Sequence, residues 1–289
     1  MQATIFTQAV LPAVLALIMF GMGLSLAVSD FTRLFKMPKP VLVGLFGQLI
    51  LLPLFAFALA AIFNAPVEIA IGLMILAACP GGTTSNLISH IAKANLALSV
   101  TLTAITTMVC VFTTPFLIKF SMDYFTLGQA KTFSLLNTSI GLILISIVPV
   151  VLGMIVRAHF SKTARRAEPK FRALSTIFMI LLIGIISYQE RNMLIVAFPS
   201  VFMYVMSLNF GATLLGVLLA KIWRLSDKDG VTLGIEIGTQ NATLSILIAV
   251  TFIQEPAYAI ASGVYGVVMY LGAFLLVFAK RKSLQTTAN

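Results

Sequence analysis

Long apolar runs separated by short polar loops are the dominant pattern of this chain. A run of about 20 apolar residues is long enough to cross a bilayer as an α-helix. The pattern therefore predicts an all-α polytopic membrane protein, in which residues 1–289 form a single transmembrane unit of about nine helices. The predicted segments are residues 6–28, 40–63, 67–92, 95–118, 133–156, 173–189, 192–220, 230–253 and 257–279.

The amino-acid composition argues against a soluble domain. Hydrophobic residues make up 60% of the chain and charged residues only 10%, with a mean hydropathy of +1.05. A soluble domain of this size needs many more charged side chains to cover its surface. The first ten residues lack a basic region and an A-x-A cleavage site, so we expect no cleaved signal peptide.

The formal charge of +10 is distributed unevenly among the predicted loops. One alternating set of loops holds sixteen basic residues, and the other holds only Lys119, Lys131 and Arg191. The positive-inside rule places the sixteen in the cytoplasm, with the N-terminus outside and the C-terminus inside. The charge thus indicates topology in a lipid bilayer and not a nucleic-acid partner. The sixteen are Arg33, Lys36, Lys39, Lys93, Arg157, Lys162, Arg165, Arg166, Lys170, Arg172, Lys221, Arg224, Lys228, Lys280, Arg281 and Lys282.

The third predicted segment contains the unusual stretch CPGGTTSN, residues 79–86. Pro80 lacks an N–H group and Gly81 and Gly82 resist helical order, so the helix should unwind near mid-membrane. Thr83 to Ser85 are good capping residues for a second half-helix, which we expect to begin near Asn86. The positive end of this half-helix would attract an anion, although a simple proline kink is the alternative interpretation.

The eighth predicted segment contains a counterpart, GIEIGTQNATLS, residues 234–245. Gly234 and Gly238 would allow a second break, and a polar cluster follows as it does in the third segment. The predicted topology makes the two segments antiparallel. Interrupted segments at corresponding places in two opposed halves are typical of an inverted-repeat transporter, so we expect two discontinuous helices that cross.

Glu236 is the one carboxylate that falls well inside a predicted segment. An intramembrane carboxylate is energetically costly and marks a functional site by default. No lysine or arginine lies at the same depth. Glu236 is therefore protonated, carries a proton cycle or binds a metal cation, and a neutral hydrogen-bonded glutamic acid is the structural alternative.

Oxygen-bearing side chains suited to a hard cation accompany Glu236 in the apolar segments. Thiolate and imidazole clusters are absent from the sequence, which disfavours a transition metal and makes sodium the favoured ion. Cys79 and Cys110 are interpreted as small packing residues. The candidate oxygen ligands are Gln48, Ser85, Asn86, Gln240 and Asn241, with a helical stripe of Asn95, Ser99 and Thr103 that Thr106 and Thr107 extend.

The motifs CPGGTTSN, NLALSVTLTAITT, EIGTQN and MFGMGL together resemble the bacterial homologues of the bile acid:sodium symporters. The resemblance extends over nearly the whole chain. It implies a panel domain of residues 1–30 and 130–190, and a core domain of residues 39–122 and 191–282 in which the third and eighth segments cross. It also implies a multi-pass protein of the bacterial inner membrane.

The resemblance further implies two sodium sites bridged by Glu236, and substrate contacts from Thr83 and Asn241. The first sodium site would use side-chain oxygens of Ser85, Asn86, Ser99, Thr103 and Glu236. The second would use Gln48, Glu236 and Gln240 with the backbone carbonyls of Ile237 and Thr239. No cofactor beyond the two coupling ions is expected.

Sodium-coupled import of an organic anion, either a bile acid or a smaller carboxylate, by alternating access is the function that these residues favour. Proton coupling through Glu236 is a second hypothesis, and an exporter of the related arsenite-carrier type is a third. A membrane enzyme is a fourth class, but the chain shows no nucleophile–base pair, and its two histidines lie near segment ends. We therefore expect a transporter and not an enzyme.

Overall fold

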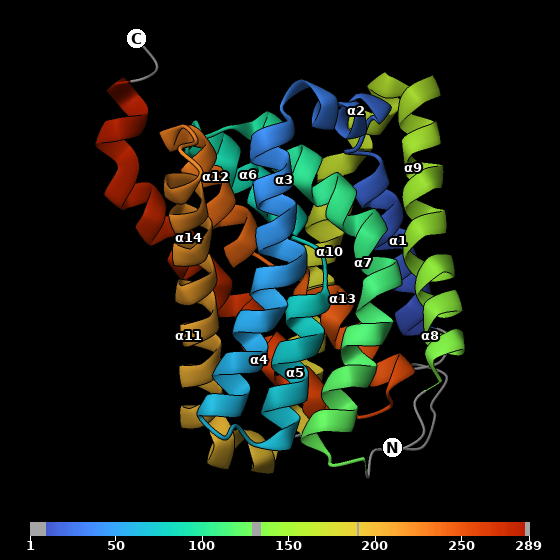
Figure 1. The fold of residues 1–289 in the computed structure, drawn as a ribbon. Coiled ribbons are helices and arrows are strands. Elements are labelled where there is room, and N and C mark those ends of the chain that lie inside the picture. The colour runs from blue at the N-terminus through green and yellow to red at the C-terminus, as the bar shows by residue number, and fades with distance from the viewer. Residues whose placement is uncertain (1–9, 129–133, 190, 287–289) are drawn as a thin grey trace.

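The computed structural model describes residues 10–128, 134–189 and 191–286, and helices form nearly all of this part of the chain (Figure 1). The α-helices are α1 (Leu11–Gly23), α2 (Val28–Lys36), α3 (Pro38–Phe46), α4 (Leu52–Ile62), α5 (Val67–Ala78), α6 (Thr83–Ile91), α7 (Leu96–Phe125), α8 (Leu135–Leu142), α9 (Val148–His159), α10 (Ser161–Gln189), α11 (Arg191–Ile222), α12 (Asp227–Gly238), α13 (Ala242–Leu247) and α14 (Ala259–Thr286). Single π-helical turns η2 (Gly47–Leu51), η3 (Ile143–Ile147) and η4 (Ile248–Phe252) continue α3, α8 and α13, and a 3₁₀ turn, η5 (Pro256–Tyr258), precedes α14.

Within the described residues, five helices are long and apolar enough to cross a membrane, which supports an all-α membrane protein. Helices α1 and α2 are bent by 56° relative to each other, and they make a sixth span only if they are counted as one. The total number of spans and the inverted repeat stay predictions. The five helices cover Pro38–Ile62, Leu96–Phe125, Leu135–His159, Phe198–Ile222 and Pro256–Lys280.

Helix α10 begins at Ser161, twelve residues before the predicted start of its segment at residue 173. The prediction was wrong because hydropathy detects only the apolar part of a helix, whereas residues 161–172 are charged. Arg172 pairs with Glu168 one turn earlier, and such a pair supports helix in a polar segment. The first three turns of α10 are therefore charged, and Glu168 and Arg172 lie on a helix and not in a loop.

The first predicted segment, residues 6–28, ends earlier in the structure than the sequence pattern predicts. Helix α1 stops at Gly23, and the chain turns before α2. The Asp30 carboxylate accepts a hydrogen bond from the Ala27 N–H at 2.7 Å and pairs with Arg33, which fixes the start of α2. The basic residues of α2 thus lie on a short separate helix.

Both predicted helix breaks are present. The chain is non-helical between Ala78 and Thr83 and between Gly238 and Ala242. The two breaks meet as an antiparallel bridge of Gly81 with Gln240. Its backbone hydrogen bonds run from Gly82 N–H to the Thr239 carbonyl at 3.0 Å and from Asn241 N–H to the Pro80 carbonyl at 2.9 Å. The unwound backbone is therefore satisfied inside the protein, as a membrane interior requires.

Two details of the predicted breaks were wrong. Helix α6 begins at Thr83 and not near Asn86, because Gly82 takes the extended capping conformation and Thr83 to Ser85 enter the first turn. Gly234 lies inside α12 and makes no break, since only the chain after Gly238 leaves the helix. The crossing is consequently shorter than the polar stretches of the sequence suggest.

Neighbouring helices bind the carbonyl groups that the breaks leave free. Thr114 of α7 donates to the Ala78 carbonyl at 2.6 Å. Asn209 of α11 and Tyr265 of α14 both donate to the Gly238 carbonyl, each at 2.9 Å. The crossing is thus held in place from three surrounding helices.

Helices α1, α9 and α10 form one side of the bundle, where Gly153 of α9 lets α1 approach closely. A Cβ atom on Gly153 would lie 2.3 Å from the Phe20 carbonyl oxygen, so only glycine fits there. Figure 1 shows α3, α4 and α11 away from α1 and α9, while α14 packs against α10 near Gly266. The division into panel and core domains is compatible with this arrangement and stays a prediction.

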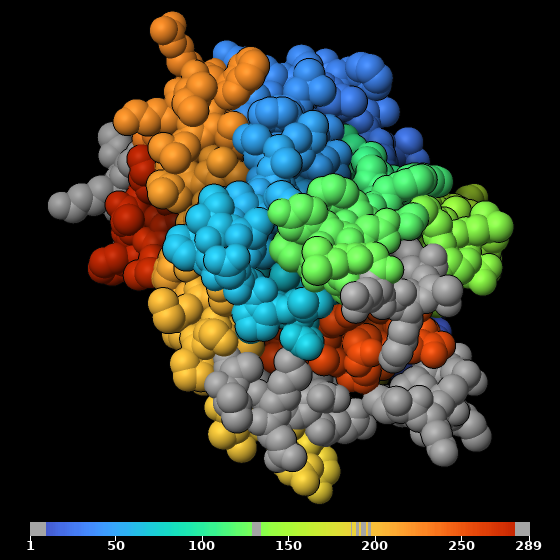
Figure 2. Space-filling view, turned by 60° about the horizontal axis from the view of Figure 1, so that its bottom comes forward, coloured from blue at the N-terminus to red at the C-terminus, as the bar shows by residue number. Residues whose placement is uncertain are grey.

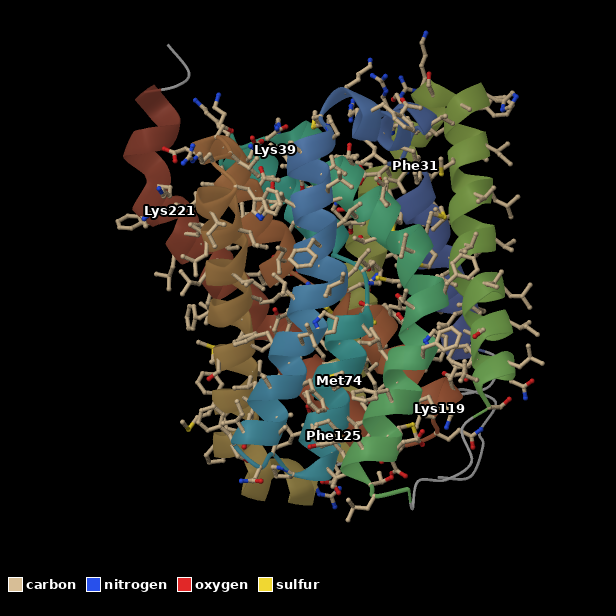
Figure 3. The ribbon with its side chains drawn as sticks, viewed as in Figure 1. Phe31, Lys39, Met74, Lys119, Phe125 and Lys221 are labelled. Carbon is tan, nitrogen blue, oxygen red and sulfur yellow. The ribbon has the colours of Figure 1, made fainter. Side chains whose placement is uncertain are left out.

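The two ends of the bundle differ in charge and packing. Lys39 and Lys221 lie at one end and Lys119 lies toward the other (Figure 3). Figure 2 shows the end with Lys119 turned forward, where side chains of the α4–α5 turn, α7 and the C-terminal third of the chain lie side by side. Met74 lies between these ends and is 1% exposed. We call the end with Lys39 and Lys221 the basic end.

Candidate functional site

Glu236 lies two residues before the end of α12, so its side chain projects at the crossing, and it is only 1% exposed. Its Oε2 atom accepts hydrogen bonds from Ser85 and Ser99, each at 2.7 Å. Its Oε1 atom accepts one from Thr103 at 2.5 Å. The structure therefore brings together residues from α6, α7 and α12 around one buried carboxylate.

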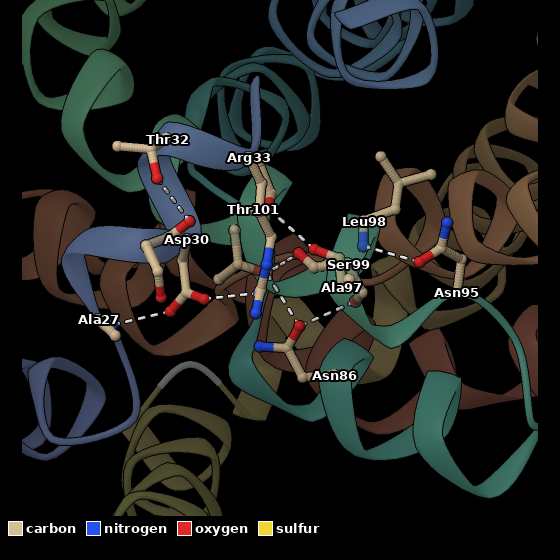
Figure 4. Close-up of polar contacts among 12 residues, drawn as sticks. Ala27, Asp30, Thr32, Arg33, Asn86, Asn95, Ala97, Leu98, Ser99 and Thr101 are labelled. Atoms are coloured by element: carbon tan, nitrogen blue, oxygen red, sulfur yellow. Dashed lines mark hydrogen bonds and ion pairs between the residues drawn. The ribbon is translucent and has the colours of Figure 1, made fainter. Parts of the chain in front are cut away.

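Asn86 completes this first oxygen group. Its Oδ1 atom lies 2.8 Å from the Ser99 hydroxyl (Figure 4) and 3.4 Å from that of Thr103. The Ser85 and Thr103 hydroxyls also lie close to the Gly82 and Ser99 backbone carbonyls. The three hydroxyls of Ser85, Ser99 and Thr103 thus face more acceptor oxygens than their three protons can satisfy. An excess of acceptors over protons is the environment that a cation stabilises.

Gln48, Gln240, Ile237 and Thr239 form a second oxygen group. The Gln48 amide donates to Gln240 Oε1 at 2.8 Å, and the Gln240 amide donates to the Ile237 carbonyl at 2.8 Å. The Gln48 Oε1 and Thr239 Oγ1 atoms are buried without a hydrogen-bond partner. Buried polar atoms rarely lack a partner, so these orphaned oxygens call for an ion or a water.

The structure does not join the two groups through the Glu236 carboxylate. Among the described residues this carboxylate accepts hydrogen bonds only from the first group. The two groups are connected instead through the backbone, since Ile237 follows Glu236 directly. The bridging role of Glu236 stays a prediction.

Gly81 places the crossing against the carboxylate. A Cβ atom on Gly81 would lie 2.7 Å from Glu236 Oε1, which is too close for any side chain. The backbone of α5–α6 thus approaches the carboxylate closely only because residue 81 is glycine.

Gly81→Ala is therefore expected to displace the Glu236 carboxylate and to weaken cation binding by at least about tenfold, a cost of about 1.4 kcal/mol. Titration of the purified protein's melting temperature with sodium chloride at constant ionic strength measures this. Gly263→Ala is the control, because its added Cβ would meet only a side-chain atom at 3.7 Å. Equal sodium affinity in the two variants would contradict the close approach.

Thr83 and Asn241 both line a cavity of about 60 Å³ at the crossing, which we call the crossing cavity. Asn241 Oδ1 accepts from the Leu244 N–H at 3.0 Å, so this residue also caps α13. The other walls come from α1, α10 and α14, which contribute Met22, Ser175 and Tyr270 among others. The two predicted substrate residues thus share one small, mixed polar and apolar space.

A second cavity, of about 370 Å³, also reaches Thr83 and Asn86, and we call it the basic cavity. Arg157, Arg165 and Arg172 line it together with Glu168 and His90. Sequence reasoning assigned these arginines to a loop and counted them only as a topology signal. Glu168 and Arg172 are four residues apart, a spacing that allows an ion pair on a helix, and this signal could have identified the segment as helical.

Asn209 is a further residue that sequence reasoning missed. It is fully buried, donates to the Gly238 and Met269 carbonyls, and accepts from the Gly272 N–H at 3.0 Å. It is a mid-segment amide, and the same criterion that singled out Gln48 could have found it. It positions the end of α12 against α14.

Other polar residues of the predicted stripe have structural partners. Asn95 donates to Asp229 at 2.7 Å and caps α7. Thr106 and Thr107 donate to carbonyls one turn earlier in α7. Cys79 and Cys110 are buried free thiols. Within the described residues, no cluster of three histidine, cysteine or acidic side chains could hold a transition metal.

Comparison with known proteins identifies the family. The sodium bile acid symporter family model matches residues 12–197. A Bacillus subtilis protein called an uncharacterized sodium-dependent transporter is 32% identical over 93% of this chain and 82% of its own length. A probable chloroplastic sodium/metabolite cotransporter of Arabidopsis thaliana is 30% identical over 88% of this chain and 62% of its own, so the chain spans less than two thirds of that protein.

These relatives are transporters, which excludes the membrane-enzyme hypothesis. The family match covers α5 and also α6 and α7, which carry Ser85, Asn86, Ser99 and Thr103, whereas α12 and α13 lie beyond residue 197. The Bacillus subtilis relative aligns with 93% of this chain. The chain belongs to the sodium bile acid symporter family.

Proposed function

We propose that this protein is a sodium-coupled symporter that imports an organic anion across a bacterial inner membrane by alternating access. Two sodium ions would bind the two oxygen groups around Glu236. The similarity to a sodium-dependent transporter and to a probable sodium/metabolite cotransporter supports sodium coupling. The observation that carries the proposal is a buried carboxylate surrounded by more acceptor oxygens than protons, next to orphaned amide and hydroxyl oxygens.

Sodium supplies the missing positive charge in the first group. The Ser85, Ser99 and Thr103 hydroxyls could turn their protons to other acceptors and offer their lone pairs to the ion, as could Asn86 Oδ1. In the second group, Gln48 Oε1 has no competing hydrogen bond to lose. The carbonyls of Ile237 and Thr239 keep a second lone pair beside their existing bonds.

Sodium binding would prepare the anion site through the crossing backbone. Gly82 N–H binds the Thr239 carbonyl, and Gly81 packs on Glu236. An ion that orders these contacts also orders Thr83 and Asn241, which line the crossing cavity. The coupling is reciprocal, so the anion should raise sodium affinity by the same factor as sodium raises anion affinity.

Alternating access is supported by the placement of the cavities. The basic cavity, with Arg157 and Arg165 in its wall, extends from the crossing toward the basic end, and neither the crossing cavity nor the basic cavity is lined by the α4–α5 turn at the opposite end. We assign the basic end to the cytoplasm by the positive-inside rule, so this conformation would face inward. A panel (residues 1–30 and 130–190) would move relative to a core (residues 39–122 and 191–282) and so open the other side. We also propose that an inverted repeat relates the two halves of the chain.

Sodium is expected to raise the melting temperature of the purified protein above its value in potassium at equal ionic strength. A ligand at 100 times its Kd stabilises the folded state by about 2.7 kcal/mol. Differential scanning fluorimetry in sodium, potassium and choline chloride from 1 to about 300 mM measures this. Equal melting temperatures in all three salts, with a strong dependence on pH, would favour proton coupling through Glu236 and contradict the sodium proposal.

A further inference from the structure

The ion pair of Glu168 and Arg172 stands where the two cavities meet. Both side chains, together with Ser25 and Thr83, line the crossing cavity and the basic cavity alike. Arg172 donates to Glu168 Oε1 from Nε at 2.9 Å and also from Nη2. A solute that passes from the crossing cavity into the basic cavity would therefore move past this pair.

Glu168 has a second potential partner on the same face of α10. Arg165 lies three residues before Glu168, and Arg172 lies four residues after it, so both neighbour the carboxylate on the helix surface. Both arginines line the basic cavity. Arg165 is exposed and forms no ion pair among the described residues. Glu168 can therefore exchange Arg172 for Arg165 by a change of rotamer within one helix.

The walls of the basic cavity carry an excess of positive charge. Three arginines face one carboxylate, and Arg157 is already fixed by its hydrogen bond to the Leu24 carbonyl at 2.8 Å. A guanidinium binds a carboxylate through two parallel N–H groups, and this is the geometry that Glu168 partly occupies on Arg172. The complementary solute is a carboxylate that takes the place of Glu168.

We propose that Arg172 binds the carboxylate of the transported anion, and that Glu168 holds this place in the absence of substrate and pairs with Arg165 when the substrate arrives. The substrate class is thus a carboxylic acid whose body reaches Thr83 and Asn241 in the crossing cavity. This inference rests on the proposed function, which supplies the anion, and adds the residue that recognises its charge.

The exchange keeps the charges of Glu168, Arg172 and the bound anion paired at both stages, and the exposed Arg165 guanidinium is solvated until it pairs with Glu168. Before binding, Arg172 neutralises Glu168; after binding, Arg172 neutralises the substrate and Arg165 neutralises Glu168. An arginine left alone beside an apolar wall would bind the substrate too tightly to release it. Competition from Glu168 lowers the affinity of Arg172 for the substrate carboxylate and so favours its release into the basic cavity. Arg157 and Arg165 would bind the carboxylate there.

The test measures the melting temperature of the full-length purified protein in sodium with three carboxylates and their neutral amides. The pairs are hexanoate and hexanamide, benzoate and benzamide, and cholate and cholamide. At least one carboxylate should stabilise the protein in a saturable way, with its amide at least about tenfold weaker. Absence of such a difference in all three pairs would overturn the proposal.

Variants of α10 then assign the difference to Arg172. Arg172→Gln should lower carboxylate affinity by at least about tenfold and leave the amide unaffected. Glu168→Gln should raise carboxylate affinity by up to about fivefold, because it removes a competitor that is only partly buried. The matched control is Arg166→Gln, the same charge change at an exposed position that lines neither cavity, and it should bind like the wild type.

A merely structural ion pair predicts a different result, since Glu168→Gln and Arg172→Gln would then weaken binding equally. That outcome would overturn the proposal, as would equal affinities of Arg172→Gln and Arg166→Gln. Arg172→Lys keeps the charge without the two parallel N–H groups, so it should bind with intermediate affinity even if Arg172→Gln folds poorly.

The sodium response of the same samples separates this inference from the proposed function. Stabilisation by sodium over potassium, without any anion, should be unchanged in all four α10 variants. If the wild type lacks that stabilisation but binds carboxylate through Arg172, sodium coupling fails and the inference stands. If sodium stabilises every variant and Arg172→Gln binds carboxylate normally, the inference fails and sodium coupling stands.

Discussion

Glu236→Gln is expected to abolish the difference in melting temperature between sodium and potassium while the protein stays folded. The substitution keeps the shape of the side chain and removes the negative charge that compensates the ions. The amide would find partners, because the Ser85, Ser99 and Thr103 hydroxyls that now donate to the carboxylate can also accept. The loss should approach the full stabilisation by sodium, about 2.7 kcal/mol at 100 times Kd.

Single-group variants are the controls for this result. Ser99→Ala removes a hydroxyl from the first oxygen group, and Gln48→Ala removes the orphaned amide oxygen from the second. Each variant should lower the difference in melting temperature between sodium and potassium partly. A protein that carries both substitutions should lose this difference as fully as Glu236→Gln does. A Glu236→Gln protein with wild-type sodium stabilisation and transport would show that this residue is structural.

Thr83→Leu is expected to abolish anion binding and to keep most of the stabilisation by sodium. Thr83 lines both cavities, and a leucine there would fill part of a crossing cavity of only about 60 Å³. Its side chain makes no hydrogen bond with the Glu236 carboxylate, whose described donors are Ser85, Ser99 and Thr103. Anion-induced shifts of melting temperature, measured in saturating sodium, report the two effects separately.

Asn241→Leu should have the same effect on the anion but destabilise the protein further. It removes the cap of α13, which costs about 1 kcal/mol. Asn241→Asp retains the capping oxygen and adds a negative charge to the crossing cavity, so it should fold like the wild type and still reject an anion. Normal anion binding by Thr83→Leu and Asn241→Asp would move the substrate site away from the crossing.

The sequence alone predicted where the two helices break and which residues gather around Glu236, because these residues conflict with their apolar surroundings. A carboxylate such as Glu236 and a proline with two glycines, Pro80 to Gly82, are conspicuous in apolar segments, where each requires a physical compensation. The structure brings Glu236 together with Ser85, Asn86, Ser99 and Thr103, as expected, and joins Gln48 to Gln240. Their role as sodium ligands stays a prediction.

The sequence was less informative where ordinary-looking residues take part. Glu168 and Arg172 were assigned to a loop although their four-residue spacing fits a helix, because hydropathy detects only the apolar part of α10, which begins at Ser161. Asn209 is a mid-segment amide like Gln48, but its role was hidden because its partners on α12 and α14 are tertiary contacts. The start of α6 at Thr83 depended on the backbone conformation of Gly82, which outweighed the capping preference of the threonines and serine that follow.

Equilibrium binding of ²²Na⁺ to the purified protein tests the central claim most directly. The account predicts two sodium ions per chain for the wild type, one each for Ser99→Ala and Gln48→Ala, and none for Glu236→Gln in the same concentration range. A saturating carboxylate should increase the affinity for both ions in the wild type. Absence of saturable sodium binding in the wild type, or binding that Glu236→Gln leaves unchanged, would contradict the account.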